Sequence, residues 1–261
     1  LSIRAQNGIS DQRKNEYSLA SQLDLDWKTP NRQSITTASG QRNMSVLYAS
    51  RPNSGTNDVL FGSSVTDPTI FYWFTNTSDL SLYTTPNFDD YHWGIKDMAY
   101  SRSKDLAYVI CVASNVSQFV VFAANPTTYG ITDIITNERT AVSADGPAIA
   151  LDNNNNLWVL AQSTNSFSKL RKYNLSANGL TATLESTLFL TNMPNGYTLR
   201  FDGENMYASS AVTAWIARIN TNNTTYAVNY FTNFGSGVVT GPSGGDGFCF
   251  SGDYIYAGQD G

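Results

Sequence analysis

Charged side chains are scarce in this chain, where they make up 14% of the 261 residues. Basic residues are not clustered beyond the short runs at 13–14 and 169–172, and the formal net charge is −5. A nucleic-acid-binding domain normally carries a basic stripe, so this class of partner is not expected. No run of 18 apolar residues occurs, and we therefore expect no membrane-spanning helix.

The chain also has few cysteines and no phosphate-binding motif. The two cysteines, Cys111 and Cys249, are too few for a disulfide framework or a cysteine-rich zinc site. They fall in different repeat units, described below, so both are expected to be thiols rather than a disulfide. The glycine-rich run at 235–247 lacks the Lys-Ser/Thr ending of a phosphate-binding loop, and nucleotide binding is not predicted.

Aromatic and small polar residues are abundant, with 15 Tyr, 13 Phe and many Asn, Ser and Thr. Aromatic side chains favour the pleated surface of strands, and Asn favours turns. The sequence also contains an internal repeat, in which an alternating apolar strand ends in Asn. The copies of this strand are at 2–7, 71–76, 120–125, 170–174 and 216–220.

Each copy is accompanied by a strand–turn–strand pair before it and by one further strand after it. From the copy at 71–76 onward, the terminal Asn residues lie 49, 49 and 46 residues apart. Four antiparallel strands repeated at this period are typical of β-propeller blades, so the sequence predicts an all-β fold of this kind. The first strands of the units begin near residues 45, 97, 148, 198 and 247.

The predicted fold is a five-bladed β-propeller of four-stranded antiparallel blades, formed by residues 1–261 as a single domain. Joined end to start, the strands at 253–258 and 2–7 fall in phase with the other units. The N-terminal strands are therefore predicted to complete the C-terminal blade and to close the ring, which removes exposed sheet edges. A β-sandwich and a truncated six-bladed ring are the alternatives. The predicted blade units are 43–85, 95–137, 146–191, 196–232, and 246–261 together with 1–22, with an insertion at 23–42.

Two strand–turn–strand segments, at 151–162 and 201–210, resemble propeller repeats of the NHL and SMP-30/lactonase type. The resemblance implies a β-propeller fold, and no catalytic residue is carried over from it. The sequence departs from the repeat because no glycine precedes Asn156. The residues that carry the resemblance are Asp152, Asn156, Leu157, Trp158 and Val159.

In a propeller, the residues around the start of each first strand surround the mouth of the central channel. Every predicted unit has Asp or Asn there. Carboxylate and amide oxygens can coordinate Ca²⁺, and they can also hydrogen-bond to sugar hydroxyls. The alternative is that these residues only turn the chain into the strand. The predicted metal ligands are Asp97, Asp145, Asn195 and Asp246.

The connection at 85–94 is the leading candidate for a ligand-binding loop. It combines acidic side chains, the only histidine of the chain and a tryptophan. Aromatic rings can stack on sugars, and an acid beside an imidazole can act as a base with an electrostatic partner. Ordinary surface polarity is the alternative explanation. The candidate ligand-binding residues are Asp89, Asp90, His92 and Trp93.

Several N-x-Ser/Thr sequons suggest a secreted or cell-surface glycoprotein. Their number is close to the chance expectation for this composition, but four of them lie at turns after the Asn-terminated strands, which should be exposed. The low charge and the Asn, Ser and Thr content favour the same localisation. The predicted glycosylation sites are Asn76, Asn174, Asn222 and Asn223.

The leading functional hypothesis is a non-catalytic, lectin-like extracellular propeller that binds a glycan or protein partner through its loop-rich face. The first alternative is a Ca²⁺-dependent hydrolase or lactonase at the channel mouth, in which the metal would polarise a carbonyl or activate water. The second alternative is a self-assembling structural subunit of a filament, coat or surface layer.

Overall fold

The structure is a computed structural model. It describes the backbone, but not the side chains, of the strands within 43–84 and 248–257. The described residues are 43–49, 59–64, 71–76, 81–84, 95–112, 118–128, 130–139, 147–164, 167–194, 196–210, 215–222, 225–231, 248–251 and 254–257.

The described part of the chain is built from antiparallel strands, which we group into five sheets. Sheet 1 contains β1 (Asn43–Ala49), β2 (Val59–Ser64), β3 (Phe71–Asn76) and β4 (Ser81–Thr84). Sheet 2 contains β5 (Ile95–Ser101), β6 (Leu106–Val112), β7 (Gln118–Ala124) and β8 (Ile131–Arg139). Sheet 3 contains β9 (Ala148–Leu151), β10 (Leu157–Thr164), β11 (Phe167–Leu175) and β12 (Ala182–Leu190). Sheet 4 contains β13 (Gly196–Phe201), β14 (Asn205–Ser210), β15 (Ile216–Asn220) and β16 (Val228–Phe231), and sheet 5 contains β17 (Phe248–Ser251) and β18 (Tyr254–Ala257).

In sheets 1 to 4 the strands pair in chain order, as expected for propeller blades. The predicted strand positions are confirmed throughout these sheets, and two strands coincide with their prediction at both ends: β3 and β15. The predicted strand at 2–7, the rest of the N-terminal part of the closing blade (1–22) and the insertion at 23–42 lie outside the described residues.

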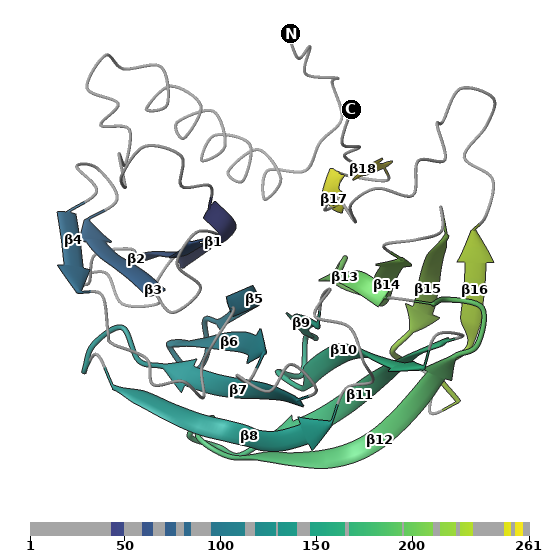
Figure 1. Ribbon diagram of the computed structural model, residues 1–261, viewed down its shortest axis with the longest axis horizontal. Helices are drawn as coiled ribbons and strands as arrows, with labels where there is room; N and C mark the ends of the chain where they lie inside the picture. Colours follow the sequence, from purple (N-terminus) through teal and green to yellow (C-terminus); the bar gives the residue numbers. More distant parts are fainter. Residues whose placement is uncertain are drawn as a thin grey trace, which may run out of the picture.

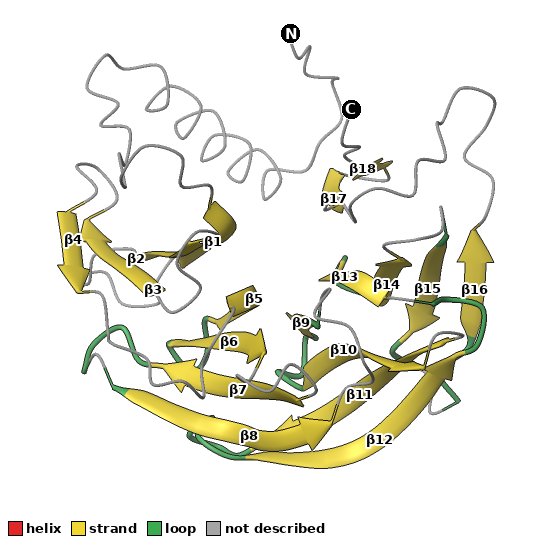
Figure 2. Cartoon of the chain, viewed as in Figure 1, coloured by secondary structure: helices red, strands yellow, loops and turns green. Residues whose placement is uncertain are grey.

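The five sheets lie side by side along an arc, with β1, β5, β9, β13 and β17 on its inner side (Figure 1). Neighbouring inner strands contact one another along this arc. Figure 2 shows strands and loops but no helix among the described residues. It follows that this part of the chain contains no helix that could cross a membrane.

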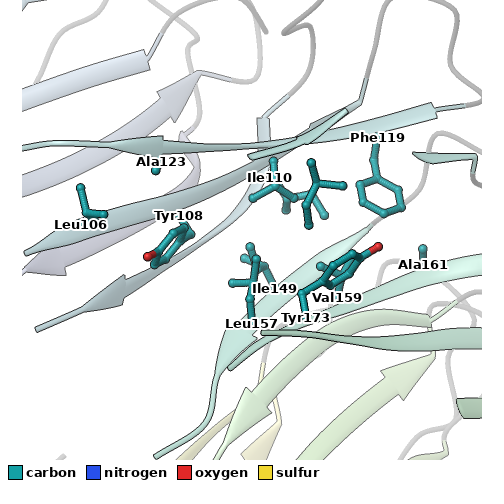
Figure 3. Close-up of a cluster of buried hydrophobic side chains, with 12 residues drawn as sticks. Leu106, Tyr108, Ile110, Phe119, Ala123, Ile149, Leu157, Val159, Ala161 and Tyr173 are labelled. Carbon is teal, nitrogen blue, oxygen red and sulfur yellow. The ribbon is translucent and has the colours of Figure 1, made fainter. Parts of the chain in front are cut away.

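In sheets 2 to 4, whose side chains are described, the core lies between the sheets, because each of these sheets buries side chains on both faces. Along β6, Leu106, Tyr108 and Ile110 point into a cluster shared by sheets 2 and 3, which Figure 3 shows in close-up. Alternate residues of the same strand, such as Val109, enter a cluster on the opposite face. A strand buried on both faces has no need for polar residues, which explains the continuous apolar run of 106–112. Each fully buried large side chain contributes roughly 1.5–3 kcal/mol.

The turns between the first and second strands are held by aspartate side chains. Asp152 Oδ1 accepts hydrogen bonds from the N–H groups of Asn154 and Asn156, both at 2.9 Å. Asn155 has a left-handed φ of 59°, a conformation that Asn tolerates better than most residues. Asn155 thus stands where the resembled repeat has glycine, and the turn forms without that glycine.

Of the three Asn-terminated strands whose side chains are described, two end in side-chain caps. Asn125 Oδ1 accepts from Thr127 N and Thr128 N, and Asn220 Oδ1 accepts from Asn222 N. In sheet 3, β11 continues past Asn174, and the Ser176 hydroxyl holds the turn instead by accepting from Thr181 N at 3.1 Å. The repeated Asn therefore has a capping role in sheets 2 and 4 but not in sheet 3.

Candidate functional site

The antiparallel strand order sorts the connections of sheets 1 to 4 onto two faces. First-to-second and third-to-fourth strand turns lie at one end, which we call the turn face. The other connections lie at the opposite end, which we call the loop face. The loop-face connections after sheets 1 to 4 are 85–94, 140–147, 191–195 and 232–247.

On the turn face, side chains reach from sheet 2 to sheet 3 and from sheet 3 to sheet 4. Asn155 Oδ1 of sheet 3 accepts hydrogen bonds from the hydroxyls of Ser101 (2.6 Å) and Ser103 (3.0 Å) of sheet 2. Asn153 Nδ2 of sheet 3 donates to the Gly203 carbonyl of sheet 4 at 2.5 Å. These hydrogen bonds use the polar groups of the turns and tie the sheets together.

The interface between sheets 2 and 3 also closes around a glycine at the turn face. The Lys104 ammonium donates to the carbonyls of Ser176 (2.9 Å) and Ala177 (3.1 Å), and the Tyr108 hydroxyl donates to the Gly179 carbonyl (3.2 Å). Gly179 has a φ of +74°, and a Cβ there would meet Leu106 Cδ1 at 2.8 Å. Only glycine fits both the backbone conformation and the available space.

At the same end of the interface between sheets 3 and 4, Lys172 is surrounded by one acidic and two aromatic side chains. The Lys172 ammonium forms an ion pair with Glu185 at 2.9 Å and lies 5.8 Å from the ring centroids of both Trp158 and Tyr226. Those two rings pack edge to face, with centroids 5.4 Å apart. Burial by itself would lower the pKa of Lys172, but the hydrogen bonds to Glu185 and Tyr226 hold it above its ordinary value.

On the loop face, the connection 191–195 is fixed by serine hydroxyls. Ser168 Oγ donates to the Met193 carbonyl at 2.9 Å and accepts from Gly196 N at 2.7 Å. Ser210 Oγ donates to the Pro194 carbonyl at 2.5 Å. This short connection is therefore part of the scaffold, which leaves the longer connections at 85–94, 140–147 and 232–247 as the variable parts of the loop face.

Asp97, one of the predicted metal ligands, lies on the inner strand β5 and joins three sheets. Its Oδ2 accepts hydrogen bonds from Ile149 N of sheet 3 (3.1 Å) and from Arg200 Nη1 of sheet 4 (2.9 Å), and its Oδ1 accepts from Met98 N (2.9 Å). The pairing of β5 with β6 is bulged between Ile95 and Asp97. A bulge re-aims the side chain next to it, which suits a residue that bridges sheets.

In the Asp97–Arg200 ion pair, the carboxylate is buried and the guanidinium is partly exposed. Burial raises the pKa of Asp97, while Arg200 and the two backbone N–H groups lower it. The Arg200 side chain is 40% exposed, so its other donors reach solvent. A calcium ion on Asp97 would have to compete with this guanidinium. No group of three or more His, Cys, Asp or Glu side chains is placed to hold a metal in the described ranges.

The remaining predicted ligands lie outside the described residues. The structure therefore brings none of them together with Asp97 and separates none of them from it. These residues are the loop candidates Asp89, Asp90, His92 and Trp93 and the metal candidates Asp145, Asn195 and Asp246.

Two of the predicted glycosylation sites are described with their side chains, and both are exposed. Asn174 lies within β11, opposite Thr183, and not in the predicted turn, because β11 continues to Leu175. Asn222 lies in the turn after β15, as predicted. The side chains of Asn76 and Asn223 lie outside the described residues. Use of the sequons stays a prediction.

Cys111 is a buried thiol, as predicted, and its Sγ donates to the Val120 carbonyl at 3.7 Å. The side chain of Cys249 lies outside the described residues.

Sequence reasoning missed two aromatic pairs at the loop face. In sheet 3, Phe167 and Phe189 pack edge to face with ring centroids 5.6 Å apart. In sheet 4, Trp215 and Tyr230 pack with ring centroids 5.9 Å apart. Each pair combines the start of a third strand with the end of a fourth, and its rings are diagonal neighbours, since Phe189 lies opposite Lys169 and Tyr230 lies opposite Ala217. The strand register is therefore the signal that identifies these pairs.

Comparison with known proteins supports the fold and no more. No family model and no curated protein matches the chain. Among solved structures, it is similar to a hypothetical selenium-binding protein from Sulfolobus tokodaii, with 10% identity, a TM-score of 0.52, and coverage of 68% of this chain and 52% of that one. It is also similar to a protein from Lactobacillus plantarum, with 14% identity, a TM-score of 0.53, and coverage of 73% and 55%. The chain thus spans about half the length of these two structures, and its four-stranded antiparallel sheets resemble propeller blades.

Proposed function

We propose that the protein is an extracellular, non-catalytic β-propeller of five blades that binds a glycan or protein partner through its loop face. The observation that carries the proposal is the contrast between the two faces. The turn face uses the polar groups of its turns in hydrogen bonds between sheets, such as Ser101 with Asn155. The loop face carries connections of unequal length, including the acidic and aromatic loop at 85–94. Unequal loops on a rigid scaffold are the usual location of binding residues.

The surroundings of Asp97 favour binding over the calcium-dependent hydrolase. Asp97 is the one predicted metal ligand with a described side chain, and Arg200 already provides it with a positive counter-charge at 2.9 Å. A removable metal would nevertheless be easy to detect. Elemental analysis that finds bound Ca²⁺, together with a melting temperature that falls on addition of EDTA, would favour the hydrolase.

The five-blade ring is part of the proposal, and it requires the strand at 2–7 to pair beside β18. The support is the phase of the repeat, in which 2–7 follows 253–258 as a third strand follows a second. Amide hydrogen exchange tests this pairing. We expect residues 2–7 to be protected to the same degree as Tyr254–Ala257, and unprotected amides at 2–7 would contradict the closed ring.

Binding itself is tested with the wild-type chain and Trp93→Ala on a glycan array. We expect binding to a defined set of glycans and its loss in the variant, because removal of the indole removes the main stacking surface of the loop. Unchanged binding by Trp93→Ala would remove this residue from the site. A chain that forms large assemblies at high concentration, measured by light scattering, would instead favour a structural subunit.

A further inference from the structure

The two aromatic pairs occupy the same place in successive interfaces between sheets. Every second residue of a strand points to the same face, so Phe167 shares a face of β11 with Tyr173, which belongs to the core between sheets 2 and 3. Phe189 lies on the same face of the neighbouring strand β12. Tyr230 packs against the core between sheets 3 and 4, and Trp215 lies beside it. Each pair therefore sits at the loop-face end of an interface and is contributed by the outer two strands of the later sheet.

The rings are fixed in position while part of their surface stays in solvent. The Phe189 side chain is 49% exposed, although Phe167 and the Lys169 ammonium, 5.6 Å from its ring centroid, both pack against it. Trp215 and Tyr230 are half-buried. A ring held by another ring loses little conformational freedom when a ligand stacks on it, so such a pair is a preorganised platform.

The size and surroundings of the pairs favour a sugar over a protein. A specific protein interface buries about 800 Å² on each partner and needs a contiguous surface. The described large apolar side chains that are exposed stand apart on two strands: Phe189 and Leu184 on β12, and Phe231 on β16. The exposed residues around Phe189 carry hydroxyl and amide groups, which can hydrogen-bond to the edge of a sugar ring. They are Thr187, Thr191 and Asn192.

We propose that the pairs Phe167–Phe189 and Trp215–Tyr230 are stacking subsites for two separate sugar rings of one neutral glycan chain, at the outer rim of the loop face. This inference rests on the proposed binding function and specifies its ligand class. A pyranose ring presents apolar C–H faces and polar edges, and it matches a platform of one aromatic pair with hydrogen-bonding neighbours. Repetition of the platform in adjacent interfaces fits a polymer better than a single sugar.

Phe231 provides a matched control. Its side chain is 41% exposed, so it offers an apolar surface similar to that of Phe189. It follows Tyr230 directly, and it pairs with Ile216, which packs on the other face of sheet 4 together with Tyr207. Phe231 is thus an exposed ring at the same end of the sheet that does not belong to either pair.

The experiment is calorimetric titration of the wild-type chain with cellohexaose, xylohexaose, mannohexaose and chitohexaose. For the hexasaccharide that binds, we expect Phe189→Ala and Trp215→Ala to weaken the affinity about tenfold and Phe231→Ala to leave it unchanged. Trp215→Tyr, which keeps an aromatic ring at this position, should retain most of the wild-type affinity. Thermal unfolding of each variant verifies that it is folded, and Phe189→Ala, which removes a half-exposed side chain, keeps the test valid if Trp215→Ala is unstable.

The outcomes separate this inference from the proposed function. If Phe189→Ala and Trp215→Ala bind as tightly as Phe231→Ala while Trp93→Ala loses binding, the rim subsites are wrong and the loop-face function stands. If the wild-type chain binds none of the four hexasaccharides, the rim subsites for neutral glycans are wrong. In that case the glycan array and a search for a protein partner decide the broader proposal.

Discussion

At the turn face, the side chains of Ser101, Lys104 and Asn153 reach from one sheet to the next, whereas the rings of Phe167 and Trp215 at the loop face pack on partners of their own sheet. The two ends of the sheets are built from similar polar and aromatic residues, but they use them differently. Hydrogen bonds from the turn side chains fix the spacing of sheets 2 to 4 at the turn face, and at the loop face Ser168 adds one such bond, to Gly196 N of sheet 4. Because these bonds supply the rigidity, the loop-face connections other than 191–195 are free to differ in length and composition.

If the turn face holds the sheets together, its tightest contact should be the most sensitive to substitution. Gly179→Ala places a methyl group against Tyr108, Leu106 and Lys104 at a position with a left-handed φ of +74°. We expect a loss of about 3 kcal/mol in the free energy of unfolding, from backbone strain and overpacking together. Denaturant titration measures this loss.

Gly203 is the control for Gly179, because it also has a left-handed φ, of +102°, but nothing lies within 4 Å of a Cβ built there. Gly203→Ala should therefore cost only the backbone strain, about 1 kcal/mol. Equal losses for the two variants would show that close contact between sheets 2 and 3 at the turn face is not a special source of stability.

The Asp97–Arg200 ion pair should be the next most sensitive contact, since it joins the inner strands of sheets 2 and 4. Arg200→Met removes the counter-charge of a buried carboxylate, and we expect a loss of about 2 kcal/mol at neutral pH, reduced by the partial exposure of Arg200. Asp97→Asn should cost less, because the partly exposed guanidinium that it leaves behind can be hydrated. Urea titration of both variants at pH 7 checks the order.

The pH dependence of Arg200→Met gives a sharper test. Burial already raises the pKa of Asp97 above its ordinary value of 3.8, and loss of Arg200 removes the largest opposing influence. A carboxyl group with a raised pKa in the folded state stabilises the fold when protonated, and this contribution is lost as the pH rises through the folded-state pKa. The deficit of Arg200→Met relative to wild type should therefore be smallest below pH 3.8 and grow towards neutral pH. A pH-independent deficit would mean that Asp97 is not the group involved.

Much of this architecture was predictable from the sequence because each sheet repeats one local pattern. The run 106–112 and the pairing of 205–210 with 216–220 follow from apolar alternation and from turns rich in Asp, Asn and Gly. Such patterns depend on neighbours in the chain, so the sequence reveals them without knowledge of the tertiary structure.

The contacts between sheets were not predictable in the same way. Asp97 stands at the start of a predicted strand and resembles a channel-mouth ligand, but its partner Arg200 is 103 positions away along the chain. The bulge in β5 that turns Asp97 towards sheets 3 and 4 depends on pairing with β6, and no residue motif marks it. The aromatic pairs were missed for a similar reason, because each forms only when two strands are brought into register.

The Asn that ends each third strand tests whether a residue repeated in the sequence also has the same structural role in each sheet. Asn220 Oδ1 accepts from Asn222 N and holds its turn, whereas in sheet 3 the corresponding bonds are made by Ser176. We expect Asn220→Ala to cost about 1 kcal/mol and Asn174→Ala, at an exposed strand position, no more than about 0.5 kcal/mol. Ser176→Ala should resemble Asn220→Ala. Chemical denaturation of the three variants separates the two cases: if Asn174→Ala is as damaging as Asn220→Ala, then the Asn side chain has the same role in both sheets and the cap is not set by the geometry of the turn.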